Sequence, residues 1–595
     1  MSTLDLGLVG NSRTSALIDR AASIVWWCYP YFDDDPICCS LLQSDRQHGG
    51  FGEIGIGLEG GSAREQRYER NSAILVTGFS DGAGNAIEVI DFAPRFYMHD
   101  RLFAPAMLVR IVRRVSGRPR VVLRVRPAVG YGSAPSDMRC GANHVSYTGA
   151  TQAMRLTTDV SVTDVTEERP FFLHDCITML FGPDETVNGA VHEVGRAFYE
   201  KTRNYWHRWA RNLDIPFEWQ QEVIRAAITL KLNAFDDTGA ITAAVTTSIP
   251  EAPHSGRNWD YRYCWLRDAF FVVNALNRLG ATGTMEKYLD YILNVIADAQ
   301  PAPLQPVYGI RRQATLEESV ASSLDGYRGM GPVRVGNQAY FQVQNDVFGS
   351  AVLAGTQAFF DTRLERPAGI ETFRNLERLG DRAVELYNVP DAGIWELRRS
   401  QRIHTYSSMM CWAACHRLGV IAEHLGLADR AACWNGHASR MHAEICKAAW
   451  NEKLSSFVST FHGDRLDASL LLMAEFRFLE ADDPRFVATV HAIERHLRRG
   501  DFLLRYDEED DFGRPESAFL VCTFWWILAL AQIGERDRAR ALFANVLGKC
   551  NHLGLLAEDV AIDSGELWGN FPQTYSMVGL IQCAARLSTP WEKAY

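Results

Sequence analysis

The chain has 595 residues, more than a single hydrophobic core usually holds, so we expect more than one domain. Hydrophobic residues make up 47% of the chain and charged residues 22%, as in ordinary soluble globular proteins. A formal net charge of −11 at pH 7 lacks the basic footprint that polyanion binding needs, so nucleic acid is not an expected partner.

Targeting, membrane and metal signals are all missing from the sequence. Residues 1–20 contain no basic segment that leads into an apolar run, so no signal peptide is predicted. The longest strongly apolar stretch, Phe524–Leu530, is far shorter than the roughly 20 residues of a membrane span. Thirteen cysteines without a C-x-x-C pair are typical of reduced cytosolic thiols and offer no zinc-site spacing. We therefore expect a cytoplasmic protein with no membrane contact, metal ion or cofactor.

Residues 1–190 have the pattern of an antiparallel β-sandwich domain. Ala73–Thr77 and Ile87–Ile90 are rich in β-branched residues, and a turn cluster separates them. Residues 108–127 repeat the pattern, with apolar and basic residues alternating as on a half-buried strand. We interpret the arginines from Arg110 to Arg126 as a solvated strand face. Many short strands with turn signals are typical of a sandwich.

Residues 191–215 look helical and are expected to link the two halves of the chain. From residue 216 to residue 595 the hydrophobic period is helical, and twelve helices are predicted. They cover residues 217–236, 265–280, 283–300, 340–362, 371–388, 408–425, 427–449, 466–480, 485–499, 517–533, 535–549 and 573–588.

Short and long links alternate between these helices. Short links make antiparallel hairpins, so all the long links should emerge at one end of the domain. Six hairpins can close into a two-layer (α/α)6 barrel, and unstructured loops this long are usually functional. An open helical solenoid for protein binding is the alternative, but its repeats would resemble one another and these segments do not.

The first long link contains aromatic, acidic and basic residues next to each other. Tyr261, Trp265, Arg267 and Asp268 lie just before or at the start of a predicted helix. Asp268 beside Arg267 could simply favour the helix dipole. The other interpretation is a sugar site, in which a carboxylate and a guanidinium bind hydroxyl groups and aromatic rings cover the C–H face.

Two other long links place a glutamate beside bulky apolar residues. Glu396 follows Trp395, and Glu558 follows Leu555-Leu556-Ala557, with Trp568 ten residues further on. Apolar neighbours desolvate a carboxyl group and raise its pKa, which suits a general acid. The two glutamates are remote along the chain, so only a fold that gathers the long links could make them partners.

Taken together, these motifs resemble glycoside hydrolase family 15, the glucoamylase and bacterial trehalase family. Gly10–Ile18 and Ile24–Cys28 are similar to the opening of bacterial members, and Arg257–Asp268 is similar to the substrate-binding stretch of the family. Trp395-Glu396 and Leu555–Glu558 match the two motifs that carry the acidic residues. The resemblance covers almost the whole chain and implies a β-sandwich packed beside an (α/α)6 barrel.

The resemblance also assigns roles to single residues. It implies that Glu396 is the general acid and Glu558 the general base of an inverting reaction. It further implies that the following residues bind substrate: Tyr261, Trp265, Arg267, Asp268, Trp395 and Trp568.

Three residues depart from the family pattern. Ala557 stands where a serine is usual, Asp559 where bacterial members commonly have a second glutamate, and Val560 where a tyrosine often follows.

The resemblance implies an exo-acting α-glucosidase on a small soluble glucoside, without a cofactor. We expect trehalose as the substrate. A glucoamylase-like hydrolase of maltose, isomaltose or malto-oligosaccharides is the alternative, and a non-catalytic sugar-binding or scaffold protein is the alternative of another class. The oligomeric state stays open, a homo-oligomer included.

Overall fold

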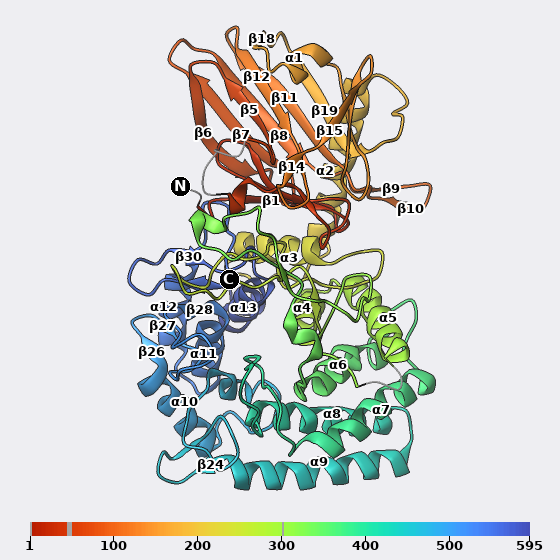
Figure 1. Cartoon of the computed structure of the whole chain (residues 1–595). Coiled ribbons are helices and arrows are strands. Elements are labelled where there is room, and N and C mark those ends of the chain that lie inside the picture. Colours follow the sequence, from red (N-terminus) through yellow and green to blue (C-terminus); the bar gives the residue numbers. More distant parts are fainter. Residues whose placement is uncertain (1–2, 44–49, 300–302, 595) are drawn as a thin grey trace.

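The structure is a computed structural model that describes residues 3–43, 50–299 and 303–594. Strands form the first part of the chain and helices form the second, and the two parts pack against each other (Figure 1). The expected fold class, an antiparallel β-sandwich followed by an (α/α)6 barrel, is confirmed.

Two antiparallel sheets make the sandwich, and their inner faces share one core that includes Trp27, Val89 and Leu123. The first sheet comprises β1 (Gly7–Gly10), β2 (Ser15–Ile18), β3 (Ile24–Cys28), β5 (Glu53–Leu58), β12 (Arg120–Arg126) and β18 (Phe171–Phe172), with β4 (Pro36–Cys38) beside β3. The second comprises, in spatial order, β15 (Asp137–Cys140), β16 (His144–Thr148), β17 (Met154–Thr158), β19 (Cys176–Pro183), β11 (Leu108–Ser116), β8 (Ala86–Phe92), β7 (Leu75–Asp81) and β6 (Gly61–Tyr68).

Smaller elements complete this domain, and a long helix covers the outer face of the second sheet. Helix α2 (Val191–Arg211) buries Val191 against Val109 and Leu180 of that sheet. Its apolar stripe is the reason why both faces of the sheet can be apolar. The smaller elements are α1 (Val162–Thr166), the 3-10 helix η1 (Ser40–Leu42), the hairpin of β9 (Phe96–Met98) with β10 (Arg101–Phe103), and the pair β13 (Ala128–Val129) with β14 (Ala134–Pro135).

One arginine of the strand interpreted as a solvated face is buried instead. Arg110 on β11 lies directly opposite Asp91 on β8 and binds its carboxylate at 2.7 and 3.1 Å. The Arg110 guanidinium also donates to the Ala22 carbonyl at 2.7 Å. The prediction is therefore wrong for Arg110, because a bidentate partner on the next strand compensates for its loss of hydration.

Six elements form the inner ring of the helical domain, each packing against the next until the ring closes. These elements are buried on nearly every side, since they contact both the barrel interior and an outer helix. The inner elements are α4 (Leu266–Arg278), α6 (Asp346–Thr356), α8 (Thr405–His424), η6 (Ala468–Leu472), α11 (Leu520–Gln532) and α13 (Thr574–Leu587). The outer helices are α3 (Gln220–Asn233), α5 (Gly283–Asp298), α7 (Ile370–Leu386), α9 (Ala428–Ala449), α10 (Pro484–Leu497) and α12 (Arg536–Leu547).

The helix predicted over 466–480 is wrong in type and length. Only Ala468–Leu472 is helical, as the 3-10 helix η6, and turns follow as far as Arg477, whose φ is +62°. Every residue of η6 is buried. A run that is apolar on all sides predicts a buried element, but it has no hydrophobic periodicity from which the type of helix could be inferred. The segment predicted at 340–362 is also divided, into η4 (Gln338–Phe341), α6 and η5 (Gln357–Phe359).

Short strand pairs and two 3-10 helices order the links and the C-terminal end. They are β20 (Cys264–Trp265) with β21 (Val307–Tyr308), β22 (Ser319–Val320) with β23 (Arg334–Val335), β24 (Trp450–Asn451) with β25 (Ser456–Phe457), β26 (Arg498–Arg499) with β27 (Phe502–Leu503), the trio β28 (Ala518–Phe519), β29 (Asp559–Val560) and β30 (Leu567–Trp568), and the 3-10 helices η3 (Tyr327–Gly329) and η7 (Trp591–Lys593). None of the helices within the described ranges combines the length and the apolar character that crossing a bilayer requires.

Candidate active site

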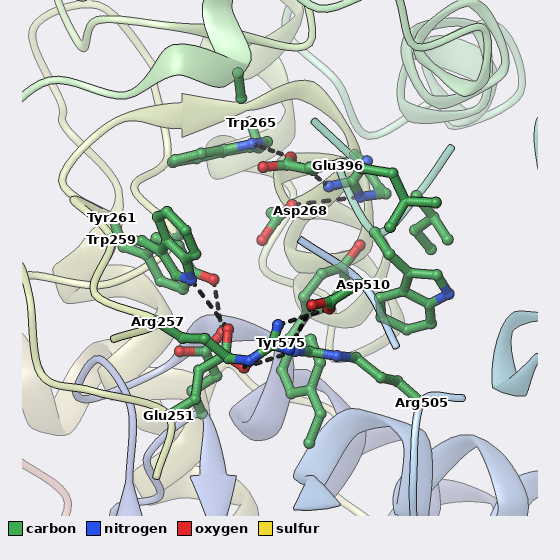
Figure 2. A pocket seen from close by; sticks show the side chains of 18 of the residues that line it. Glu251, Arg257, Trp259, Tyr261, Trp265, Asp268, Glu396, Arg505, Asp510 and Tyr575 are labelled. Atoms are coloured by element: carbon green, nitrogen blue, oxygen red, sulfur yellow. Dashed lines mark hydrogen bonds and ion pairs between the residues drawn. The ribbon is translucent and has the colours of Figure 1, made fainter. Parts of the chain in front are cut away.

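One cavity lies where the long links of the barrel meet, with a volume of about 920 Å³ when its open mouth is counted. Five of the six long links supply its wall, which confirms that they emerge at the same end of the barrel. The residues that the sequence singled out and that line it are Tyr261, Trp265, Arg267, Asp268, Trp395, Glu396 and Glu558. Figure 2 shows Trp265, Asp268 and Glu396 on one side of this cavity and Glu251, Arg257, Arg505 and Asp510 on the other.

The first long link is held between the barrel and the sandwich by a buried ion pair. Arg262 binds the Asp260 carboxylate at 2.8 and 2.7 Å, and neither side chain is exposed. The same guanidinium donates to the Asp34 carbonyl at 2.9 Å and to the Tyr131 hydroxyl at 2.9 Å, both in the sandwich domain. The sandwich therefore fixes the backbone on either side of Tyr261.

Glu558 is a buried carboxyl group held by that same link. The Tyr261 hydroxyl donates to its Oε1 at 2.6 Å, and the Asn570 backbone N–H approaches its Oε2 at 3.4 Å. Burial raises the pKa of Glu558 well above its ordinary value, and the adjacent Asp559 raises it further. Gly569 has a φ of +77°, and a Cβ there would lie 2.5 Å from that of Glu558, so this close approach requires glycine.

Glu396 sits at the end of a tight turn that points its side chain into the cavity. Its backbone N–H donates to the Gly393 carbonyl at 3.2 Å, and its φ of +58° is a left-handed conformation unusual for a glutamate. The Trp265 indole N–H donates to Glu396 Oε1 at 2.7 Å, and Arg267 donates to the same oxygen at 3.1 Å. Such backbone strain persists only where the surroundings over-determine it, which here points to a functional constraint.

A single guanidinium serves three carboxyl groups at this end of the cavity. Arg267 lies 3.1 Å from Glu396, 3.4 Å from Asp346 and 3.8 Å from Asp268. Burial raises the pKa of Asp268 to about 7, against the lowering effect of Arg267. Because one buried positive charge cannot balance three negative ones, this cluster favours a state in which at least one carboxyl group keeps its proton.

Tyr261 and Trp265 join the two glutamates through neighbouring rings. Their ring centroids lie 5.5 Å apart, at an interplanar angle of 70°. Tyr261 binds Glu558 and Trp265 binds Glu396, so two side chains of one link hold both acidic groups. Trp395 also lines the cavity, and its indole N–H donates to Asp467 Oδ2 at 2.6 Å.

Trp568 does not line the cavity, although the sequence interpretation placed it with the substrate. It is buried below the Arg328 guanidinium, which lies 5.1 Å from its ring centroid, and it makes an edge contact with Tyr327. Strand β30 pairs Trp568 with Asp559, the residue next to Glu558. Because neighbouring residues of a strand face opposite ways, this pairing turns Trp568 away from the side of Glu558.

The three departures from the family pattern lie in the core around Glu558. Asp559 is buried and accepts from the Ser517 hydroxyl at 2.9 Å, and burial raises its pKa to about 8. Val560 and Ala557 are fully buried and do not line the cavity. The side chain of Val560 therefore contributes to packing in the core and does not contact a ligand in the cavity.

Several lining residues escaped the sequence interpretation. Glu251 lies earlier in the first link, and Arg505, Asp510 and Phe512 lie in the link before α11. Glu251 lies alone between two prolines, and Asp510 lies in an acidic loop. Neither stretch matches a recognisable sequence motif, so only the folded structure shows that these residues line the cavity. In the described ranges, no group of three or more His, Cys, Asp or Glu residues is placed to hold a metal ion.

Comparison with known proteins agrees with this architecture. The model of glycosyl hydrolases family 15 matches residues 219–585, and the model of the trehalase-like N-terminal domain matches residues 4–171. Trehalases of Mycolicibacterium smegmatis and Mycobacterium tuberculosis are each 31% identical to this chain over 99% of its length and over 92% and 90% of their own. A bacterial glucoamylase solved with acarbose superposes with a TM-score of 0.69 at 13% identity, over 98% of this chain and 94% of its own.

A carboxylate-lined and aromatic-lined cavity at one end of an (α/α)6 barrel defines a carbohydrate-cleaving enzyme, a glycoside hydrolase. The chain belongs to glycosyl hydrolases family 15.

The buried ion pair between Asp260 and Arg262 gives a test of how the sandwich supports the site. Arg262→Leu leaves the Asp260 carboxylate buried and uncompensated, so the free energy of unfolding should fall by about 3–5 kcal/mol. The double variant with Asp260→Asn removes that charge and should recover part of the loss. Chemical denaturation of the three proteins measures both effects, and a double variant less stable than Arg262→Leu would contradict the argument.

Proposed function

We propose that the enzyme hydrolyses α,α-trehalose to two glucose molecules, with inversion at the anomeric carbon that water attacks. The observation that carries the reaction type is the presence of Glu396 and Glu558 in one cavity, each held through a different aromatic residue of the same link. The substrate is supported by similarity to trehalases over nearly the whole chain, the N-terminal domain included.

Glu396 acts as the general acid in this proposal. Its Oε1 accepts hydrogen bonds from Trp265 and Arg267, which leaves Oε2 to carry the proton that passes to the glycosidic oxygen. Arg267 holds this carboxyl group in place at 3.1 Å. The proton leaves with the departing glucose as its hydroxyl group.

Glu558 acts as the general base and removes a proton from the water that attacks the anomeric carbon. Its raised pKa makes the carboxylate a stronger base than an ordinary glutamate, which suits proton abstraction. The hydrogen bond from Tyr261 fixes which oxygen remains available. An inverting pair needs carboxyl groups about 6.5–9.5 Å apart, so that the water fits between base and sugar.

The glucose ring under attack is bound beside Glu396. Arg267 and Asp268 supply donors and acceptors for its hydroxyl groups, and Tyr261, Trp265 and Trp395 supply apolar ring surfaces. The aromatic rings exclude water from the bound sugar. Arg267 and Asp268 fix the orientation of the sugar ring.

The anomers released in the first minutes test both substrate and stereochemistry. Inverting hydrolysis of α,α-trehalose converts one ring to β-glucose and releases the other as α-glucose, so proton NMR should show equal amounts before mutarotation. A retaining reaction would give α-glucose alone. No release from trehalose together with β-glucose from maltose would favour the glucoamylase-like alternative.

Glu558→Gln should lower kcat on trehalose by about 10²–10⁴-fold, because it removes the base. Binding should persist, since the amide keeps the size of the side chain and can still accept from Tyr261. Steady-state kinetics and calorimetry with trehalose measure the two properties. Activity close to that of the original enzyme would overturn the assignment of the base.

Glu396→Gln should depend on the leaving group. Trehalose needs protonation of its glycosidic oxygen, so its kcat should fall by about 10²-fold or more. A glucoside of an acidic phenol departs with little protonation, and its hydrolysis should fall much less. Equal losses on trehalose and on 4-nitrophenyl α-glucoside would argue against Glu396 as the acid.

Asp559→Asn should move the acid limb of kcat/KM on trehalose to lower pH. Asp559 is a neighbouring buried carboxyl group that competes with Glu558 for ionisation: once Asp559 is ionised it raises the pKa of Glu558, and asparagine removes this competitor. With a lower pKa, Glu558 stays ionised at lower pH and keeps its activity as base there. The original enzyme should lose activity well above pH 4.3, near which an unperturbed glutamate titrates. A limb that stays in place or moves upward in the variant contradicts this reasoning.

A further inference from the structure

The cavity holds a further carboxylate, Glu251, on the side away from Asp268 and Glu396 (Figure 2). It is buried, yet it lines the cavity. Its Oε1 accepts from the Trp259 indole N–H at 3.0 Å, and its Oε2 accepts from Arg505 at 2.6 Å. A carboxylate can accept about four hydrogen bonds, so each oxygen keeps capacity for a further donor.

Arg505 supplies the complementary group beside Glu251. It also lines the cavity, and one nitrogen of its guanidinium binds Glu251. Its Nε is buried and has no hydrogen-bond partner in the part of the chain that the structure describes. Arg505 therefore brings a positive charge and further N–H groups to the wall beside Glu251.

The cavity is lined by a pair of a guanidinium and a carboxylate on one side, Arg267 with Asp268, and by two such pairs on the other, Arg505 with Glu251 and Arg257 with Asp510. Figure 2 labels Asp268 on the first side and the other two pairs opposite it. The two rings of α,α-trehalose are identical glucopyranoses, so each presents the same hydroxyl groups. With charged pairs on both sides, the cavity can bind hydroxyl groups of one ring beside Arg267 and of the second ring beside Glu251.

We propose that Glu251 binds hydroxyl groups of the departing glucose and makes the enzyme selective for a second ring at that position. The inference rests on the proposed function, since it assigns the ring that leaves trehalose.

Neighbouring loops hold Glu251 in a fixed position. Trp259, which donates to it, packs edge-on against Phe512 with ring centroids 5.0 Å apart, and Arg398 lies 4.7 Å above the Trp259 ring. Arg257 fixes the loop that carries Phe512, through two bonds to Asp510 at 2.7 and 2.6 Å. A carboxylate held before the substrate arrives costs less to order, which strengthens its contribution to binding.

The test compares two substrates that share only one ring. Trehalose fills both sides of the cavity, whereas α-glucosyl fluoride has one glucose and a fluoride leaving group. Glu251→Gln should lower the ratio of kcat/KM on trehalose to kcat/KM on the fluoride by about 10–100-fold, the range expected for hydrogen bonds to a charged group. Any effect of Glu251 on Glu558 acts on both substrates and cancels in the ratio.

A second variant and a matched control separate binding from folding. Trp259→Phe keeps the ring against Phe512 but removes the donor to Glu251, and should lower the same ratio by several-fold. Glu377 on α7 is the control, because it also accepts from an indole N–H, that of Trp434 at 2.8 Å, and from an arginine, Arg430 at 2.6 Å, but it does not line the cavity. Glu377→Gln should leave the ratio within twofold of its original value.

Each outcome decides a different question. An unchanged ratio in Glu251→Gln, or an equal shift in Glu377→Gln, would overturn the assignment of Glu251 while trehalose hydrolysis stands. If the original enzyme hydrolyses the fluoride but not trehalose, the proposed substrate is wrong whatever the variants do. If both substrates are inert, the catalytic proposal itself fails.

Discussion

The site depends on one segment, Trp259–Trp265, which lies between the sandwich and the barrel just before α4. Along it, Asp260 and Arg262 form an unexposed ion pair that faces the sandwich, while Tyr261 lines the cavity between them. The pair would be costly to bury alone, but bonds to the Asp34 carbonyl and the Tyr131 hydroxyl satisfy the guanidinium. The sandwich is thus part of the machinery that positions Glu558 and Glu396, which bind Tyr261 and Trp265.

Charge balance in a desolvated cavity is the second constraint. Acidic groups outnumber the arginines that face them around Arg267, and Glu558 has Asp559 and Glu251 as negative neighbours. Burial makes each extra negative charge expensive, so protons are held on some carboxyl groups near neutral pH. An inverting hydrolysis needs this condition, with one carboxyl group protonated and another ionised at the same moment. Packing around these carboxyl groups therefore suits the inverting hydrolysis proposed above, without requiring an unusual residue type.

Sequence reasoning succeeded where a pattern has one physical cause. The β-branched run Ile87–Ile90 predicted a strand, and helical periods with alternating link lengths predicted the barrel. It failed where the neighbour across space decides. Arg110 is buried because Asp91 lies opposite on the next strand, and Trp568 faces the core because of its register in β30. The apolar segment at 466–480 carried no period, so its helix type could not be predicted.

The sequence by itself determined the two-part architecture and the short motifs around Asp268, Glu396 and Glu558, because hydrophobic periodicity and local motifs depend only on residues that are close together in the sequence. Tertiary structure alone decided that Glu251 and Arg505 share a cavity with them, since these residues lie 254 positions apart and carry no motif. It also decided which carboxyl groups are desolvated, because burial depends on what packs around a group and not on its neighbours in sequence.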